Sequence, residues 1–294
     1  MNQESHSWQI VGLFLVKNEE YSIEWAISNV LDFCDRIIVC DNGSTDRTME
    51  IVEQLANQHA KIECHHISNA RDSHTFIESY AGTSTWVFAV DGDEIYDPVG
   101  LRALRADLLQ GKYADQFKLL GYSMHTCKLA VEQQEAEGYL GPPAKTVNKL
   151  YNFSVLECWR NPPYERLHGG EIAFKAGCDS EVRLQLSKDF SWDHAPLRCL
   201  HLCFIRRSSL QMKTSEGYMR KNISDLSSRK PWLVRMWKHA TFALSFRRYR
   251  PGRVSAWKME NYRQGELRHL PINSFFTGNY SDHWLACELS DMNR

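Results

Sequence analysis

The sequence predicts an α/β fold with a mainly parallel central sheet and flanking helices. Short apolar runs rich in Val, Ile and Leu occur at 8–16, 36–40 and 86–90, and they have the composition of strands buried on both faces. Segments whose apolar residues recur at roughly helical spacing lie between them, at 21–33 and 49–58. Strands that alternate with helices at this spacing are typical of βαβ units, which place their strands in parallel.

The predicted elements follow one another closely up to about residue 97. The first strand, 8–16, is followed by the polar segment Lys17–Glu20 and the first helix. The second strand ends at Asp41, where an Asn-Gly turn and a capping Ser44 or Thr45 predict the start of the second helix. The segments 61–68, 76–84 and 86–90 then read as a strand, a helix and a strand. This order extends the βαβ pattern.

After residue 97 the pattern weakens. We expect a helix at 100–110, strands within 115–126, 146–159 and 197–205, and helices at 209–223 and 231–250. The stretch from Pro196 to Leu270 holds 17 Lys and Arg against four Asp and Glu, although the whole chain of 294 residues has a net charge of −1. Such an asymmetry suggests two functional surfaces. We therefore expect a first domain, 1–205, and a basic, aromatic-rich helical region, 206–294.

The basic region has its own candidate partner. Residues 229–253 interleave Trp, Phe and Leu with Arg and Lys, which suits an interfacial helix on an anionic membrane surface. A packed helical subdomain with a basic outer face is the alternative. No recognised nucleic-acid-binding module is present, so we expect no nucleic-acid partner. No apolar run approaches the roughly 20 residues of a membrane-spanning helix, and the polar N-terminus has no signal-peptide pattern. These features predict a cytoplasmic protein that is peripheral on the inner face of the membrane.

Three predicted strands end in acidic or polar clusters, at 17–20, 41–42 and 91–94. The carboxyl ends of parallel strands share one edge of a sheet, where ligands bind. Asp91 and Asp93, one residue apart after a buried strand, are suited to a hard divalent cation such as Mg²⁺ or Mn²⁺. A solvent-exposed acidic turn is the competing interpretation of this pair. Three polar strand ends on one edge favour a shared polar ligand.

The segments VKNEE, DRIIVCDNGSTDRT and WVFAVDGDE, in this order and spacing, resemble the family 2 glycosyltransferases with the GT-A fold. The resemblance covers residues 10–100 well and extends loosely to about 220, where the bacterial lipopolysaccharide-core glucosyltransferase-like branch is most similar. It implies that the first domain is a GT-A glycosyltransferase domain. It also implies an inverting transfer from a nucleotide-sugar donor, with UDP as the commonest nucleotide, and a Mn²⁺ or Mg²⁺ cofactor.

The resemblance also assigns individual residues. It implies contacts to the donor nucleotide from Val16, Asn18, Glu19, Asp41, Arg71, Asp91 and Lys149. Asp93 and His201 match metal ligands, and Glu94 matches the acidic residue after the DxD pair. Glu165, in NPPYERLHGG, matches a carboxylate that serves as general base, and Asp193 is the second candidate. In the same loop Tyr164 stands where relatives carry a histidine.

The acceptor implied by the resemblance is a glycan or a lipid-linked sugar, as in cell-surface polysaccharide or lipopolysaccharide synthesis. Two other functions fit part of the pattern. A nucleotidyltransferase shares the sheet, nucleotide and metal, but such enzymes typically have a glycine-rich basic loop after the first strand, where this chain has KNEE. A non-catalytic sugar-nucleotide-binding protein is the third alternative, and the presence of Asp41, Asp93, Glu165 and His201 together argues against it.

Overall fold

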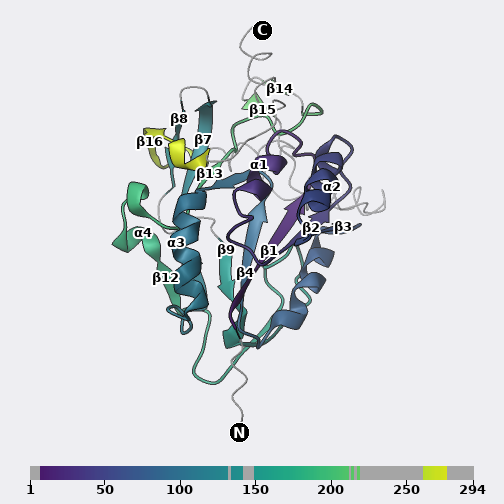
Figure 1. Ribbon diagram of the computed structural model, residues 1–294, viewed down its shortest axis with the longest axis vertical. Coiled ribbons are helices and arrows are strands. Elements are labelled where there is room, and N and C mark those ends of the chain that lie inside the picture. Colours follow the sequence, from purple (N-terminus) through teal and green to yellow (C-terminus); the bar gives the residue numbers. More distant parts are fainter. Residues whose placement is uncertain are drawn as a thin grey trace, which may run out of the picture.

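The computed structural model of the protein describes residues 7–131, 134–141, 149–211, 213–214, 217–218 and 261–276. Its central feature is a seven-stranded sheet in the order β12-β6-β9-β4-β1-β2-β3 (Figure 1). The strands are β1 Gln9–Val16, β2 Arg36–Asp41, β3 Ile62–His66, β4 Thr85–Asp91, β6 Lys118–Leu120, β9 Lys149–Asn152 and β12 Arg183–Gln185. The four neighbours β4, β1, β2 and β3 are parallel, whereas β9 runs antiparallel to β4 and β6.

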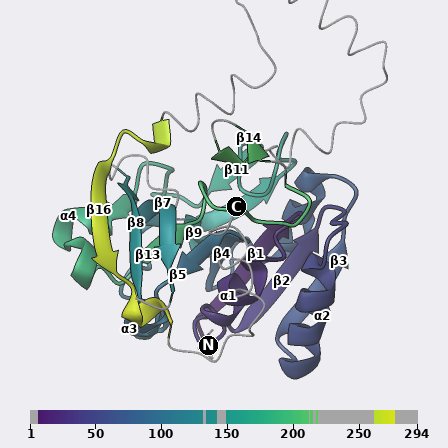
Figure 2. The same ribbon diagram turned by 90° about the horizontal axis from the view of Figure 1, so that it is seen from above.

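Both faces of this sheet are covered, which explains the unbroken apolar composition of β1 and β4. Figures 1 and 2 show the helices α1, α2 and α3 on one face. On that face Phe14 and Phe88 belong to the larger hydrophobic core. On the other face Leu13 and Ala89 pack in a second core with Trp159. The helices are α1 Ile23–Ser28, α2 Thr48–Gln58, α3 Pro98–Leu109 and α4 Leu186–Asp189.

The start of α3 follows from local sequence. The Asp97 side chain accepts a hydrogen bond from Val99 N at 3.0 Å, and Pro98 occupies the first turn, where a missing N–H costs little. The predicted helix at 76–84 is wrong. Two 3₁₀ helices, η1 Ala70–Phe76 and η2 Glu78–Tyr80, stand there instead. Further 3₁₀ turns are η4 Phe153–Val155, η5 Trp192–His194 and η6 Asn273–Phe275.

A second, five-stranded sheet continues from the end of β4 in the order β16-β8-β7-β13-β5. Its strands are β5 Glu94–Tyr96, β7 Tyr122–Ala130, β8 Glu135–Leu140, β13 Arg198–His201 and β16 Glu266–Pro271. Two hairpins complete the described strands: β10 Leu156–Arg160 with β11 Glu171–Phe174, and β14 Lys213–Thr214 with β15 Gly217–Tyr218. The residues of β14 and β15 fall within the segment 209–223, where we expected a helix.

The described residues 261–276 pack on earlier parts of the chain. β16 pairs with β8 along six residues, and Figure 2 shows it at the edge of the second sheet. The side chains of Trp25 and Asn29 donate to the carbonyl of Phe275. The predicted membrane segment 229–253 lies outside the described residues. Within the residues the structure covers, no helix is long and apolar enough to cross a bilayer. The mixed α/β class with a mainly parallel central sheet is confirmed.

Candidate active site

The three polar strand ends lie side by side, as the sequence predicts. In the parallel pairing of β1 with β2, Val16 stands beside Asp41, and in the pairing of β1 with β4, Leu15 stands beside Asp91. The segments that follow these strands therefore start from the same edge of the sheet. Val16 is itself fully buried, and its carbonyl accepts from Asn42 N at 3.0 Å.

The loop after β1 is tied to the loop after β2. Asn18 has a positive φ of 53°, which places its side chain amide toward the second loop, where Oδ1 accepts from Thr45 N at 2.8 Å. Asn18 N donates to Ser44 Oγ at 3.0 Å, and Glu19 N donates to Thr48 Oγ1 at 2.8 Å. A positive φ is unusual outside glycine, and Asn tolerates it better than most residues. These bonds make the two loops one unit.

Asp41 is held firmly at the end of β2. Its carboxylate is 2% exposed and accepts hydrogen bonds from the backbone N–H groups of Ser44 at 3.0 Å and Gly43 at 3.2 Å. His66 Nδ1, at the end of β3, lies 3.3 Å from the same carboxylate. Asp41 therefore presents a fixed acceptor between the ends of β2 and β3.

Glu19 and Asp93 meet at the end of β4, and a basic residue joins them. Both side chains are almost fully buried. Arg207 Nη1 donates to Glu19 Oε1 at 3.0 Å and lies 3.8 Å from Asp93 Oδ2. A Cβ at position 92 would stand 2.0 Å from Glu19 Oε2 and 3.2 Å from Ile23 Cδ1, so any larger residue would require the Glu19 side chain to move. Gly92 thus permits the close approach of the loop after β1 to the turn after β4.

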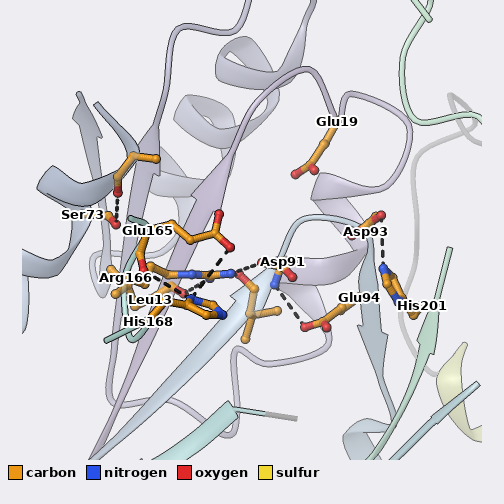
Figure 3. A network of polar contacts seen from close by, with 12 residues as sticks. Leu13, Glu19, Ser73, Asp91, Asp93, Glu94, Glu165, Arg166, His168 and His201 are labelled. Carbon is orange, nitrogen blue, oxygen red and sulfur yellow. Dashed lines mark hydrogen bonds and ion pairs between the residues drawn. The ribbon is translucent and has the colours of Figure 1, made fainter. Parts of the chain in front are cut away.

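The predicted metal ligands Asp93 and His201 are neighbours. His201 Nε2 lies 3.6 Å from Asp93 Oδ2, and both side chains are at least nine-tenths buried (Figure 3). His201 reaches this place because β13 pairs with β5, which sets it opposite Glu94. The ring of His125, on β7, lies 5.5 Å from that of His201, centroid to centroid.

The donor set fits a divalent cation. Carboxylate oxygen and imidazole nitrogen are ligands that suit Mn²⁺. In the part of the chain that the structure covers, no group of three or more His, Cys, Asp or Glu side chains is arranged to hold a metal alone. A cation bound by one or two protein side chains together with substrate phosphates needs no such group. Asp93 and His201 would hold the ion in this arrangement.

Glu94 has a structural task that the sequence did not reveal. Its side chain is fully buried, and Oε2 accepts from Asp91 N at 3.2 Å and from the Tyr96 hydroxyl at 3.1 Å. Burial is the main reason that the pKa of Tyr96 is raised well above its usual value, and the neighbouring Glu94 charge adds to the effect. Glu94 therefore supports the turn that presents Asp91 and Asp93.

Asp91 forms an ion pair with an arginine from a distant loop. Arg166, from the loop between β10 and β11, forms an ion pair with Asp91 Oδ1 through Nη2 (Figure 3). The preceding residue is Glu165, the predicted base, whose side chain is about one-third exposed, with Oε1 3.8 Å from His168 Nδ1. The structure thus brings the loop that carries Glu165 to the end of β4, about 70 residues earlier in the chain.

The other three predicted residues lie in η1, β9 and η5. Arg71 is exposed in η1, with its Nε 3.7 Å from Asp72. Lys149 begins β9, and its backbone is in register with Ala89 of β4. Asp193 is exposed in η5, before β13 begins, whereas His201 is the last residue of that strand. Glu165 directly precedes Arg166, which pairs with Asp91, whereas Asp193 lies eight residues before His201 in the chain.

Sequence reasoning missed Arg166 and Arg207. Both are arginines that lie close to a predicted residue, Arg166 directly after Glu165 and Arg207 six residues after His201. The excess of acidic groups at the strand ends was the available signal, because buried carboxylates need a countercharge. It could not identify which of the many arginines supplies it.

Residues 14–126 match the family model described as glycosyl transferase family 2. Comparison with curated proteins finds no match. Among solved structures, the chain is similar to glucosyl-3-phosphoglycerate synthase from Mycobacterium tuberculosis in complex with Mn²⁺, UDP and glucosyl-3-phosphoglycerate. The identity is 21%, covering 40% of this chain and 44% of that one, with a TM-score of 0.30.

Two further structures show likenesses of the same order. A mannosyltransferase from Pyrobaculum calidifontis in complex with GDP-Man and Mn²⁺ is 18% identical over 42% of this chain and 37% of its own, with a TM-score of 0.30. A UDP-glucose pyrophosphorylase complexed with UDP-glucose is 8% identical over 66% of this chain and 90% of its own, with a TM-score of 0.28. The chain spans less than half the length of the synthase and of the mannosyltransferase that it matches.

Proposed function

We propose that the protein is an inverting, divalent-metal-dependent glycosyltransferase of the family 2 type, with a nucleotide-sugar donor. The observation that carries this proposal is the meeting of Asp93 with His201 and Arg207 at the end of β4. Asp93 lies within the segment that matches the family model. The placement of Asp41 at the end of β2, which is separated from β4 only by β1, supports the proposal, because one nucleotide diphosphate can span the ends of neighbouring strands.

The side chains have distinct roles in the proposed reaction. Asp41 accepts a hydrogen bond from the base or ribose of the donor, and Asp93 with His201 holds the cation. When bound, the cation neutralises charge that develops on the diphosphate leaving group. Arg207 can contribute a second positive charge to the same group, since its guanidinium already lies between Glu19 and Asp93.

Glu165 is the proposed general base. Its carboxylate takes the proton of the acceptor hydroxyl while the acceptor oxygen forms a bond to the anomeric carbon. The bond from that carbon to the diphosphate oxygen breaks in the same displacement, and the electron pair leaves with the diphosphate. Attack from the side opposite the leaving group inverts the anomeric centre, so no covalent sugar–enzyme intermediate is needed.

The donor and acceptor belong to the proposal as well. We favour a UDP-sugar carrying a hexose, and a glycan or lipid-linked acceptor of the kind used in cell-surface polysaccharide or lipopolysaccharide synthesis. The support is the sequence resemblance and the basic composition of 229–253, which suits an anionic membrane surface where such an acceptor would be found. The chain would then act as a peripheral protein on the cytoplasmic side.

A screen of nucleotide sugars tests the proposal. UDP-, GDP- and CDP-sugars are each titrated by calorimetry with Mn²⁺ or Mg²⁺, and tight binding of one donor only with metal is expected. In Asp93→Ala that metal-dependent affinity should fall by about 100-fold or more, since one of the two protein ligands is lost. Asp107→Ala, which removes an exposed carboxylate on α3 that pairs with Lys112, is the control and should bind normally.

Two outcomes would favour other functions. Nucleotidyl transfer from a nucleoside triphosphate to a sugar phosphate, without sugar transfer, would make the protein a nucleotidyltransferase. Metal-dependent donor binding without slow donor hydrolysis or transfer to any glycan would make it a binding protein. Metal-independent donor binding that survives Asp93→Ala would refute the assignment of the metal site.

A further inference from the structure

Arg166 is a buried charge whose position is unusual. Its side chain is 1% exposed, although it belongs to a loop whose neighbours Glu165 and His168 are partly or largely exposed. Nη1 donates to the carbonyls of Leu13 at 3.0 Å and Val90 at 2.6 Å, and Nη2 pairs with Asp91. One guanidinium therefore contacts the backbones of β1 and β4 and the first carboxylate of the DxD pair.

Burying this charge is costly, so its environment must compensate. A buried ion pair repays its desolvation best when its geometry is good and its other donors are bonded. Nη1 and Nη2 of Arg166 are bonded, whereas its buried Nε has no partner among the described residues. Burial lowers the pKa of Arg166 to about 10, and the side chain therefore remains charged at neutral pH. Its backbone is also constrained. Arg166 has a φ of 30°, and residues other than glycine adopt a positive φ rarely, because it costs conformational energy. Such local strain occurs where the surroundings hold a residue in place.

The same loop is anchored at other points. Trp159 Nε1 donates to the carbonyl of Gly169 at 2.9 Å, and His74 Nε2 lies 2.8 Å from the carbonyl of Trp159. These contacts fix the flanks of the loop to the second hydrophobic core. Arg166 differs from these anchoring residues because it connects the loop to the end of β4, where Asp91 lies (Figure 3).

We propose that Arg166 is a positioning residue that sets Asp91 and the Glu165 loop in one arrangement. The Arg166 side chain then holds both Asp91, which is proposed to contact the sugar donor, and the loop that carries the proposed base Glu165. A base must lie within hydrogen-bond reach of the proton it removes, and a displacement of about 1 Å can cost 100-fold in rate. The consequence for turnover rests on the proposed function, whereas the structural link between the two segments does not.

Hydrogen exchange on the full chain tests the link without any activity. Arg166→Lys keeps the charge but loses the planar fork that reaches several acceptors at once. We expect amide exchange to become about tenfold faster both in 161–170 and in 91–94, since each segment loses a charge-assisted contact. Asp91→Asn breaks the same ion pair from its more exposed end and should produce the same pattern. It serves as the second variant if Arg166→Lys folds poorly.

The matched control is Arg105→Lys, at the other end of the sheet. Arg105 pairs with Asp35 at 2.5 Å, and Asp35 accepts from Ile10 N near the start of β1. This variant should accelerate exchange locally and leave 91–94 and 161–170 unchanged. Exchange that rises equally across the protein in Arg166→Lys, or only in 161–170, would show that Arg166 merely stabilises the fold or its own loop. Either result would overturn the proposal.

Turnover and binding of UDP with Mn²⁺ supply a second readout. For folded Arg166→Lys we expect UDP affinity to fall about tenfold through Asp91, and kcat at saturating donor to fall about 100-fold through Glu165. In a Glu165→Gln background, Arg166→Lys should lower kcat by less than about threefold further, because the two residues act as one unit. Full additivity would contradict the proposal. If the wild-type chain transfers no sugar, the proposed function fails while the exchange experiment still decides the role of Arg166.

Discussion

At the scale of single residues, Gly92 shows how closely the site is packed. An alanine Cβ there would meet Glu19 Oε2 at 2.0 Å and the Ile23 side chain at 3.2 Å. Glu19 cannot move aside freely, because it is buried and bonded to Arg207. We expect Gly92→Ala to lower the free energy of unfolding by about 1–3 kcal/mol, as overpacking usually does, and to weaken metal-dependent donor binding. Urea denaturation and calorimetry measure the two effects.

A compensating change separates these two effects. Glu19→Ala removes the atoms that the new Cβ would strike, so Gly92→Ala should cost less stability in that background than in the wild type. Donor binding should stay weak in the double variant, because Glu19 and its contact to Arg207 are gone. An equal loss of stability in both backgrounds would show that the clash with Glu19 is not the cause.

The second prediction at this scale concerns Glu165. Glu165→Gln keeps the size of the side chain but removes its basicity. Donor affinity should remain within about threefold of the wild type, while kcat falls by about 100- to 10,000-fold, the usual contribution of a general base. Rapid-quench measurement of transfer at saturating donor checks this. Asp193→Asn, in η5, is the matched comparison and should transfer sugar at nearly the normal rate. The reverse pattern would move the role of base to Asp193.

At the scale of elements, the segment after β13 docks on the loop after β1. Ser209 N donates to Glu20 Oε1 at 2.6 Å, Tyr21 N donates to the carbonyl of Arg207 at 3.1 Å, and Arg207 reaches Glu19. Glu20 also accepts from Arg47 N, just before α2, at 3.1 Å. The Glu20 carboxylate therefore joins the ends of three elements that are distant in the sequence.

This arrangement predicts a dependence on pH. Burial acts to raise the pKa of Glu20, but hydrogen bonds from Ser209, Arg47 and Ser208 lower it below its ordinary value of 4.5. A carboxyl whose pKa is lower in the folded state contributes stability that is complete above pH 4.5 and is lost as the pH falls through the folded-state pKa. Glu20→Gln should therefore destabilise the protein at pH 7 and lose less stability than the wild type on further acidification.

Urea denaturation between pH 7 and pH 3 measures this difference. The control is Glu53→Gln on the exposed side of α2, which should follow the wild-type pH profile. If Glu20→Gln lost as much stability as the wild type between pH 5 and pH 3, the acid sensitivity would arise from other carboxylates. Asp35, whose pKa is also lowered despite burial, by Arg105 and Ile10 N, would be the next candidate.

At the scale of the whole molecule, charge is divided unequally. The acidic strand ends lie between residues 17 and 94, and the excess of Lys and Arg lies between Pro196 and Leu270. We expect the full chain to sediment with anionic liposomes at low salt and to be released at high salt. Salt screens the attraction between the basic side chains and the anionic lipids, with a Debye length of about 10 Å at an ionic strength of 0.1 M. Neutral liposomes are the control. Absence of binding to anionic liposomes even at low salt would contradict a peripheral membrane role for 229–253.

Much of the fold and part of the site could be read from local pattern. Burial on both faces makes β1 and β4 continuously apolar, and this composition alone predicts strands of a parallel sheet. Parallel strands carry their carboxyl ends to one edge, so the adjacency of the polar segments after β1, β2 and β4 followed from the order of the elements. The helix predicted at 76–84 is replaced by the single 3₁₀ turn η2 and the end of η1, because a short apolar spacing fits either kind of helix.

The countercharges of the site depended on the three-dimensional path of the chain. Arg166 meets Asp91, and Arg207 meets Glu19, across about 75 and 188 residues respectively. Local sequence patterns do not predict such pairs. Which arginine forms the ion pair depends on where its loop crosses the edge of the sheet and on how much water the contact excludes. His201 differs from these arginines, because the family resemblance implied its role beside Asp93, and the pairing of β13 with β5 brings it there. Residue types and strand order thus indicated a ligand site lined by carboxylates. Only the long-range packing of the chain determined which arginines pair with those carboxylates.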